Sequence, residues 1–138
     1  MKKAVILLSG GLDSSTTAFL ARKQIGSTGE LYALSISYNQ RHVRELDCAR
    51  LIAEEVKIKD HRFFQLPLNE LVSGATALTK DSEHEIPTSG LAPGIPLSWV
   101  PQRNSIFLSL AFAYAEAVDA DFIYAGMNHL DYSGYPDC

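Results

Sequence analysis

The sequence predicts an α/β protein: a doubly wound parallel sheet of the Rossmann-like class, with helices on both faces and three layers in all. Short apolar runs alternate with longer segments of helical periodicity, as in strands joined by crossover helices. The runs Ala4–Leu8 and Leu31–Leu34 are apolar almost throughout, which is typical of strands covered on both faces. The first run ends in a turn with two adjacent glycines, Gly10 and Gly11, and a helical segment follows it.

The first half of the chain begins with two strands, each followed by a helix. Residues 3–8 are the first predicted strand, and residues 13–25 are a helix that ends near Gly26. Residues 31–37 are the second strand. Residues 42–56 are predicted to be a helix because apolar side chains recur there at helical spacing. The stripe consists of Val43, Leu46, Ala49, Ile52, Ala53 and Val56.

The second half contains two further strands separated by a long irregular stretch. Residues 61–66 are the third predicted strand, which Pro67 stops. Residues 68–100 have weak periodicity, and so long a stretch inside a compact domain is typical of a lid or functional loop. Residues 104–118 are apolar almost all round, which predicts a buried helix. Residues 122–126 are the fourth strand.

The composition indicates one globular domain over residues 1–138, because 46% of the residues are hydrophobic and 20% are charged. No apolar run reaches the length of a membrane span and no signal peptide precedes the first strand, so we expect a cytoplasmic protein. Cys48 and Cys138 are expected to be reduced. The net charge of −4 favours a small-molecule substrate over nucleic acid.

The turn after the first strand has the features of a phosphate site. Adjacent glycines permit positive φ and a close approach to a ligand. The helix that follows offers unpaired N–H groups and the positive end of its dipole. The hydroxyls of Ser9, Ser14 and Ser15 surround this point, and Asp13 is expected either to cap the helix or to bind Mg²⁺. The turn has neither the lysine of a Walker loop nor the glycine spacing of a dinucleotide fingerprint.

Two further polar clusters stand at element boundaries. Residues 38–42 follow the second strand and form either a pocket wall or a capped helix start with an Arg41–Glu45 ion pair. Arg103 opens the third long helix, where a guanidinium favours a carboxylate or phosphate partner. Asn104 beside it is either a helix cap or a ligand group.

A fourth cluster follows the last strand, at residues 126–138. Residues 131–137 contain two acids and two tyrosines, a density that favours a polar pocket for a flat heterocycle. The rings can stack on such a heterocycle while the carboxylates accept hydrogen bonds from its N–H groups. Because the carboxyl ends of parallel strands lie at one edge of a sheet, we expect the clusters at 9–15, 37–42 and 127–137 to converge.

These motifs resemble known sequences at two levels. The run S-G-G-L-D-S-S at residues 9–15 resembles the pyrophosphate loop of the ATP pyrophosphatase (PP-loop) superfamily, whose fold is of the adenine nucleotide alpha-hydrolase-like type. The full set of motifs resembles the 7-cyano-7-deazaguanine synthase family of queuosine biosynthesis, and the resemblance runs from Lys2 to the last residue. The other motifs are Y-N-Q-R-H-x-x-E (38–45), V-P-Q-R-N-S-I-F-L-S-L-A (100–111) and D-Y-S-G-Y-P-D-C (131–138).

The resemblance implies an ATP-dependent ligase that converts 7-carboxy-7-deazaguanine and ammonia into 7-cyano-7-deazaguanine, through an adenylated carboxylate and an amide. It implies ATP with Mg²⁺, small-molecule partners, a homodimer, and no direct contact with nucleic acid or membrane. The implied ATP-binding residues are Ser9, Gly10, Gly11, Leu12, Asp13, Ser14, Ser15 and Ser37. The implied substrate-binding or catalytic residues are Tyr38, Gln40, Arg41, His42, Glu45, Arg103, Asn104, Asn128, Asp131, Tyr132, Ser133, Tyr135 and Asp137.

The chain departs from that family at its end. The family continues through a further strand and helix to a four-cysteine zinc site, and none of those cysteines is present here. We therefore expect no metal-ligating cysteine and a domain that is incomplete at its C-terminus. Three alternatives stay open: a tRNA-modifying enzyme of the superfamily, one that passes a deazapurine to another amine, and a non-catalytic ATP-binding fragment.

Overall fold

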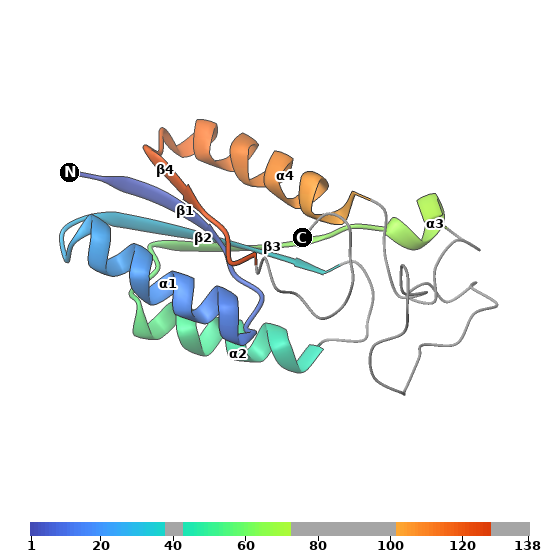
Figure 1. Cartoon of the computed structure of the whole chain (residues 1–138), viewed down its shortest axis with the longest axis horizontal. Helices are drawn as coiled ribbons and strands as arrows, with labels where there is room; N and C mark the ends of the chain where they lie inside the picture. Colours follow the sequence, from blue (N-terminus) through green and yellow to red (C-terminus); the bar gives the residue numbers. More distant parts are fainter. Residues whose placement is uncertain (38–42, 73–101, 128–138) are drawn as a thin grey trace.

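The computed structural model describes residues 1–37, 43–72 and 102–127, which form a four-stranded parallel sheet between helices (Figure 1). The strands are β1 (Lys3–Leu7), β2 (Glu30–Ser37), β3 (Asp60–Gln65) and β4 (Phe122–Tyr124). The helices are α1 (Leu12–Ile25), α2 (Val43–Glu55), α3 (Leu68–Val72) and α4 (Arg103–Val118). Helices α1 and α2 lie on one face of the sheet and α4 lies on the other, which confirms the predicted three-layer α/β fold.

The period of two in β1 divides its side chains between two hydrophobic cores. Ala4 and Ile6 pack with the core under α1 and α2, whereas Val5 packs with the core under α4. Both cores are closed by small side chains, which let the helices approach the sheet closely. On the α1 and α2 side they are Ala18, Ala21, Ala49 and Ala53, and on the α4 side Ala111 and Ala115. The predicted apolar stripe of α2 is confirmed at Ala49, Ala53 and Val56, all of which are buried.

The strand order β3–β2–β1–β4 produces a topological switch beside β1. The chain leaves β1 toward β2 and β3, and then returns to pair β4 with the opposite edge of β1. In doubly wound sheets the crevice at such a switch point, outside the carboxyl ends of the strands, is where ligands bind. The fold therefore directs attention to the segments that follow β1 and β4.

The structure corrects three expectations. Helix α4 is not buried all round, because of the helices that the structure describes it is the one that covers its face of the sheet: Phe112 is 63% exposed while Tyr114 is buried. Helix α4 begins at Arg103, and its N-cap is Gln102 in the left-handed conformation, so Asn104 lies inside the helix and does not cap it. A short helix, α3, was not predicted; it occupies the first residues of the stretch expected to be irregular. No helix in the described part of the chain is long and apolar enough to cross a membrane.

Candidate nucleotide site

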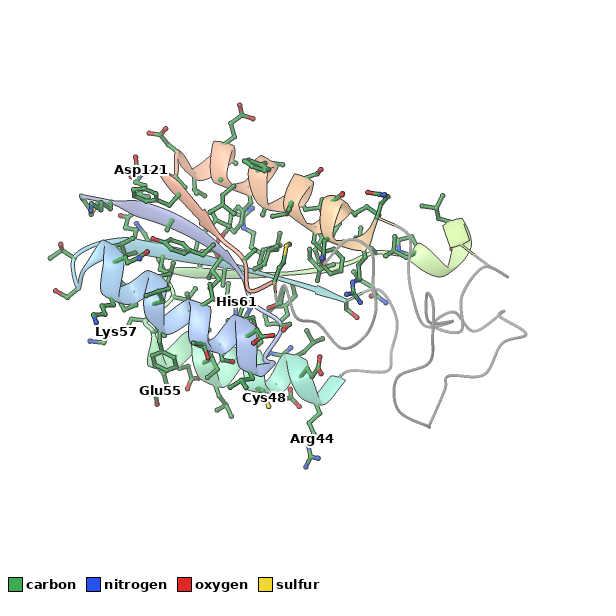
Figure 2. All side chains as sticks on the ribbon, in the orientation of Figure 1. Arg44, Cys48, Glu55, Lys57, His61 and Asp121 are labelled. Atoms are coloured by element: carbon green, nitrogen blue, oxygen red, sulfur yellow. The ribbon has the colours of Figure 1, made fainter. Side chains whose placement is uncertain are left out.

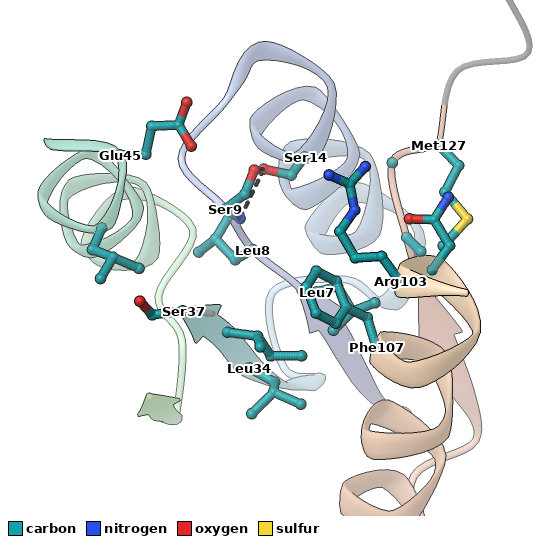
Figure 3. Close-up of a pocket in the computed structure, with 15 residues that line it drawn as sticks. Leu7, Leu8, Ser9, Ser14, Leu34, Ser37, Glu45, Arg103, Phe107 and Met127 are labelled. Carbon is teal, nitrogen blue, oxygen red and sulfur yellow. Dashed lines mark hydrogen bonds between the residues drawn. The ribbon is translucent and has the colours of Figure 1, made fainter. Parts of the chain in front are cut away.

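A cavity of about 340 Å³ lies at the carboxyl edge of the sheet, a volume within the range of small-molecule sites (Figure 3). It is bounded by the ends of β1, β2 and β4, by α2 and by the start of α4. Its polar lining consists of Ser9, Ser14, Ser37, Glu45, Arg103 and Asn104. Its apolar lining includes Leu7, Leu34, Ile36, Phe107 and Met127. Predicted site residues from three separate segments thus lie around one cavity.

The loop after β1 is closed by hydrogen bonds between two serines. The Ser14 hydroxyl accepts a bond from the Ser9 N–H at 3.1 Å and lies 3.0 Å from the Ser9 hydroxyl (Figure 3). The Ser9 hydroxyl in turn accepts a bond from the Gly11 N–H at 3.2 Å. These bonds hold the loop in a tight turn against the first turn of α1.

The first turn of α1 supplies an anion-binding element beside that loop. Its first intrahelical bond runs from the Ser15 N–H to the Gly11 carbonyl, at 3.0 Å. The N–H groups of Leu12, Asp13 and Ser14 precede this bond and have no acceptor within the helix. Together with the positive end of the helix dipole, they form an arrangement that binds phosphate groups.

Gly10 and Gly11 have different roles, which sequence reasoning treated as one. Gly10 has φ +88°, and a Cβ there would lie 2.0 Å from the Glu45 carbonyl oxygen and 2.9 Å from the Ala49 nitrogen. Its missing side chain therefore allows the loop to pack on the backbone of α2. Gly11 has φ −76°, so the expected positive φ is wrong for this residue. Gly11 is the N-cap of α1.

Gly126, which follows β4, makes a second backbone contact that the sequence did not reveal. A Cβ at Gly126 would lie 2.7 Å from the carbonyl carbon and oxygen of Asp13 and 2.9 Å from the Ser14 nitrogen. The end of β4 is thus pressed against the first turn of α1. The fourth sequence cluster therefore starts at the first turn of α1. This turn directly follows residues 8–11, the loop between β1 and α1, which is called the phosphate loop below.

Asp13 does not cap α1, contrary to one of its two expected roles. The N-cap is Gly11, and no side-chain hydrogen bond caps the helix. Asp13 is exposed, and among the described residues its carboxylate has no hydrogen-bond or ion-pair partner. A carboxylate in the same helical turn as a phosphate-binding element is suited to hold Mg²⁺ together with phosphate oxygens. Mg²⁺ binding by Asp13 stays a prediction.

Arg103 places a positive charge on the wall of the cavity opposite α2. Figure 3 shows its side chain extending from the start of α4 toward the loop that carries Ser9 and Ser14. Phe107 lies one helical turn further along and lines the same cavity. Sequence reasoning missed Phe107, although its i+4 spacing from Arg103 places it on the same helix face.

Not every predicted residue lines the cavity. Gly10, Gly11, Leu12, Asp13 and Ser15 form the loop and the first turn of α1 and are absent from the lining, and Leu12 is 83% exposed. The remaining predicted residues lie outside the described part of the chain. They are Tyr38, Gln40, Arg41, His42, Asn128, Asp131, Tyr132, Ser133, Tyr135 and Asp137.

The described residues do not fit a zinc site. Within residues 1–37, 43–72 and 102–127, no three His, Cys, Asp or Glu side chains are grouped so as to hold a metal ion. Cys48, the cysteine of these ranges, is exposed on α2. Four-thiolate zinc needs two closely spaced cysteine pairs, and the whole chain has two cysteines.

The fold and the cavity define an α/β protein with an anion-binding arrangement of N–H groups after its first strand. The family model described as "Queuosine biosynthesis protein QueC" matches residues 3–138, and the chain belongs to this family. The motif-based identification is thereby confirmed.

Curated relatives named 7-cyano-7-deazaguanine synthase agree with this assignment. One from Nitrosospira multiformis is 50% identical over 138 residues, which are 100% of this chain and 57% of that protein. One from Aromatoleum aromaticum is 47% identical over 137 residues, 99% of this chain and 58% of that protein. The chain thus spans somewhat more than half the length of the curated relatives it matches.

Two solved structures share this fold. The NH3-dependent NAD synthetase from Campylobacter jejuni has a TM-score of 0.58 at 19% identity, over 91% of this chain and 47% of that one. The U34-tRNA thiolase NcsA from Methanococcus maripaludis also has a TM-score of 0.58 at 19% identity, over 92% of this chain and 38% of that one. At this identity the likeness concerns the fold.

Proposed function

We propose that this chain is the ATP-using part of an enzyme that converts 7-carboxy-7-deazaguanine and ammonia into 7-cyano-7-deazaguanine. The observation that carries the proposal is the shared cavity, in which Arg103 extends toward the serine loop and the open start of α1. An anion-binding turn and a facing guanidinium suit the transfer of an adenylyl group, in which negative charge must be held at two places. Membership of the QueC family and the names of the curated relatives support this choice of substrate.

The proposed reaction has two activation steps. A carboxylate oxygen of the deazapurine attacks the α-phosphorus of ATP, and pyrophosphate leaves. Ammonia then attacks the acyl carbon, AMP leaves, and an amide forms with release of a proton. The amide oxygen is adenylated by a second ATP, with loss of pyrophosphate and of one N–H proton. Loss of AMP and a proton from this imidate gives the nitrile. No covalent nucleophile from the protein is needed, because each adenylate supplies its own leaving group.

The described residues divide this work between the two ends of the cavity. The N–H groups at the start of α1, with the Ser9 and Ser14 hydroxyls, hold the departing pyrophosphate. Arg103 orients the substrate carboxylate or neutralises the α-phosphate during the attack. The apolar wall of Leu34 and Phe107 accommodates the face of a flat base. Asp13 would hold Mg²⁺, which supplies charge neutralisation at the phosphates when bound.

Recognition of the deazapurine is assigned to the last motif of the sequence. A guanine-like base presents N–H and NH₂ groups along one edge, and Asp131 or Asp137 would accept hydrogen bonds from them. Asp131→Asn is therefore expected to weaken deazapurine binding and to leave ATP binding intact. Equal loss of both ligands, with a lower unfolding temperature, argues against this role for Asp131.

We further propose that the protein acts in the cytoplasm, as a homodimer, on small molecules and not on nucleic acid. The net charge of −4 supports the last point, because nucleic-acid binders usually present a basic surface. Size-exclusion chromatography with light scattering tests the dimer.

The direct test of the reaction is incubation with ATP, Mg²⁺, ammonium and 7-carboxy-7-deazaguanine, followed by mass spectrometry for AMP, the amide and the nitrile. Nitrile that forms together with AMP, and only with the deazapurine present, establishes the function. AMP with a different amine product identifies another acceptor. Binding of ATP without AMP formation contradicts catalysis by this chain and favours a nucleotide-binding module.

A further inference from the structure

A buried hydroxyl outside the cavity contacts the first carbonyl of the phosphate loop. Ser35 lies in β2 and is 1% exposed. Its Oγ is within hydrogen-bond distance of the Leu8 carbonyl oxygen and lies 2.7 Å from Nε2 of His61 on β3. A polar group this deeply buried is costly unless both bonds are made.

The chemistry of the three groups fixes the direction of both bonds. A carbonyl oxygen can only accept, so the single proton of the Ser35 hydroxyl is directed to Leu8. The Ser35 Oγ must then accept from His61, whose Nε2 therefore carries a hydrogen. The result is a directional chain from the His61 ring through the Ser35 hydroxyl to the Leu8 carbonyl.

The peptide bond at the end of this chain is the first of the phosphate loop. Strand β1 ends at Leu7, and the Leu8 carbonyl belongs to the peptide unit that joins Leu8 to Ser9. The N–H of the same unit donates to the Ser14 hydroxyl at 3.1 Å. One peptide is thus held at its oxygen by Ser35 and at its nitrogen by Ser14, and its orientation sets how the loop meets α1.

His61 is itself held in place from its outer side. Its ring lies 4.2 Å from that of Phe63, centroid to centroid, and the Arg50 guanidinium of α2 lies 4.6 Å from the centre of the Phe63 ring. His61, labelled in Figure 2, is thus about half buried between the sheet and these groups. A ring so constrained can act as a fixed donor.

We propose that His61 is a positioning residue for the phosphate loop: by donating to Ser35 it directs the Ser35 hydroxyl onto Leu8 and so orients the Leu8–Ser9 peptide. The residue contacts neither ATP nor the substrate. What the positioned loop binds, the pyrophosphate part of ATP, rests on the function proposed above.

The test compares His61→Leu with His61→Gln, since the glutamine amide keeps an N–H donor near the position of Nε2. The matched control is Arg62→Gln on the same strand, because Arg62 bonds to Asp60 and stacks over Tyr114 of α4 instead. Binding of inorganic pyrophosphate with Mg²⁺ is measured by calorimetry. Hydrogen exchange of the Ser9 amide is measured by NMR, together with the unfolding temperature.

We expect His61→Leu to weaken pyrophosphate binding about tenfold, the effect of one lost hydrogen bond, and to accelerate Ser9 amide exchange. His61→Gln should restore both, and Arg62→Gln should alter neither. The proposal is overturned if His61→Leu leaves Ser9 exchange and pyrophosphate affinity unchanged, or if the leucine and glutamine variants lose affinity equally.

Two further results would change which measurement tests the role of His61. If the unmodified chain binds no pyrophosphate, the proposed function fails, and Ser9 exchange alone decides whether His61 positions the loop. If His61→Leu does not fold, Ser35→Ala replaces it, because it removes the bond to Leu8 through which His61 is proposed to act and leaves His61 in place. Slow Ser9 exchange in that variant, equal to the unmodified chain, overturns the proposal.

Discussion

The two ends of helix α1 differ in whether a side chain binds the backbone groups around them. Each end of a helix leaves backbone groups without an intrahelical partner. At the C-terminal end, the Arg22 guanidinium donates to the carbonyl of Gly26, the C-cap of α1, and to that of Gly29 in the turn that follows. It also donates to the carbonyls of Val56 and Lys57, just after α2, and all four distances are 2.7–2.9 Å. At the N-terminal end, the N-cap is Gly11, and no side-chain hydrogen bond of the described residues caps the helix.

The same contrast extends along the two edges of the sheet. At the amino edge, where the strands begin, the Glu30 carboxylate accepts from Lys59 and from the Tyr32 hydroxyl, both at 2.7 Å. Asp60 there accepts from Arg62 and from the Tyr114 hydroxyl, both at 2.8 Å. The bond from Lys59, and after it that from Tyr32, lower the pKa of Glu30. The bond from Arg62, and after it that from Tyr114, lower the pKa of Asp60.

The carboxyl edge adds close backbone contacts to its serine hydrogen bonds. Gly10 rests on α2 and Gly126 rests on the start of α1, each with no room for a Cβ. Among the described residues no side-chain hydrogen bond caps the start of α1, so its N–H groups can serve a ligand. The comparison teaches that charged side chains pair with one another at the amino edge, whereas the carboxyl edge is closed by serine hydroxyls and by glycines that let backbones meet.

The largest effect is expected for Gly10→Ala. A Cβ 2.0 Å from the Glu45 carbonyl oxygen cannot be accommodated without moving the loop or α2, so we expect a loss of about 4 kcal/mol in the free energy of unfolding. Pyrophosphate binding should be lost as well. Chemical denaturation and calorimetry measure the two quantities.

Gly26→Ala is the matched control at the amino edge. Gly26 also has a positive φ, +82°, but nothing lies within 4 Å of its Cβ position. Only backbone strain of about 2 kcal/mol is expected, with pyrophosphate affinity unchanged. Equal effects of the two alanines on binding contradict the division between the edges.

Arg22→Met should come next, with a loss of about 3 kcal/mol, because it leaves several partly buried carbonyls without a charged donor. Pyrophosphate affinity is expected to stay within twofold of the unmodified chain. Lys23→Met, an exposed change one residue along the same helix, is the control. A large loss of affinity in Arg22→Met shows that the two edges are coupled.

Arg103→Met is expected to act on function and not on folding. Loss of a charge-assisted bond to a phosphate or carboxylate costs about 1.5–3 kcal/mol, or roughly tenfold to a hundredfold in kcat/KM for AMP formation. Arg44→Met, a change on the exposed surface of α2, should leave the rate unaltered (Figure 2). An unfolding midpoint that falls only in Arg103→Met assigns this arginine to the scaffold.

The smallest expected effect is the dependence of stability on pH, in which His61 and Asp60 of β3 act over different pH ranges. Burial, and after it the charge of Arg50, lower the pKa of His61 below its ordinary 6.5. As the pH falls, His61 is therefore protonated in the unfolded chain before it is protonated in the folded chain. Stability should therefore decline as pH falls below 6.5, by less than about 1 kcal/mol after solvent screening. The lowered pKa of Asp60 adds a loss only below its ordinary 3.8.

His61→Gln should abolish the decline between pH 6.5 and 5 and retain the loss at lower pH. Denaturation midpoints measured from pH 8 to pH 3 give both parts of the curve. A decline near pH 6 that persists in His61→Gln assigns it to another group.

Much of the fold could be predicted because its elements are strongly patterned over short distances. The apolar runs at β1 and β2 and the stripe on α2 are local signals, and the structure follows them. The phosphate loop was recognisable because Gly10, Gly11 and the serines are adjacent in the sequence. The cavity contacts of Arg103 followed from its place at a helix start.

What could not be predicted depends on residues far apart in the chain. Arg22 and Val56 are 34 positions apart, and nothing near Arg22 distinguishes it from an exposed helix arginine. The packing of Gly10 on α2 and of Gly126 on α1 requires knowledge of which backbones cross. Gln102 has a left-handed backbone conformation where the chain enters α4, and glutamine is not a residue type that predicts this conformation.

The positions of the carbonyls that Arg22 binds also bear on the order in which parts of the protein fold during synthesis. All four carbonyls that it binds belong to residues before position 58, so a nascent chain that has emerged this far already contains the whole bonded group. Domains fold as the N-terminal parts leave the ribosome. The strands β1 and β2 with α1 and α2 can therefore form a nascent half, and the segment from Arg103 to Met127 completes the nucleotide cavity last.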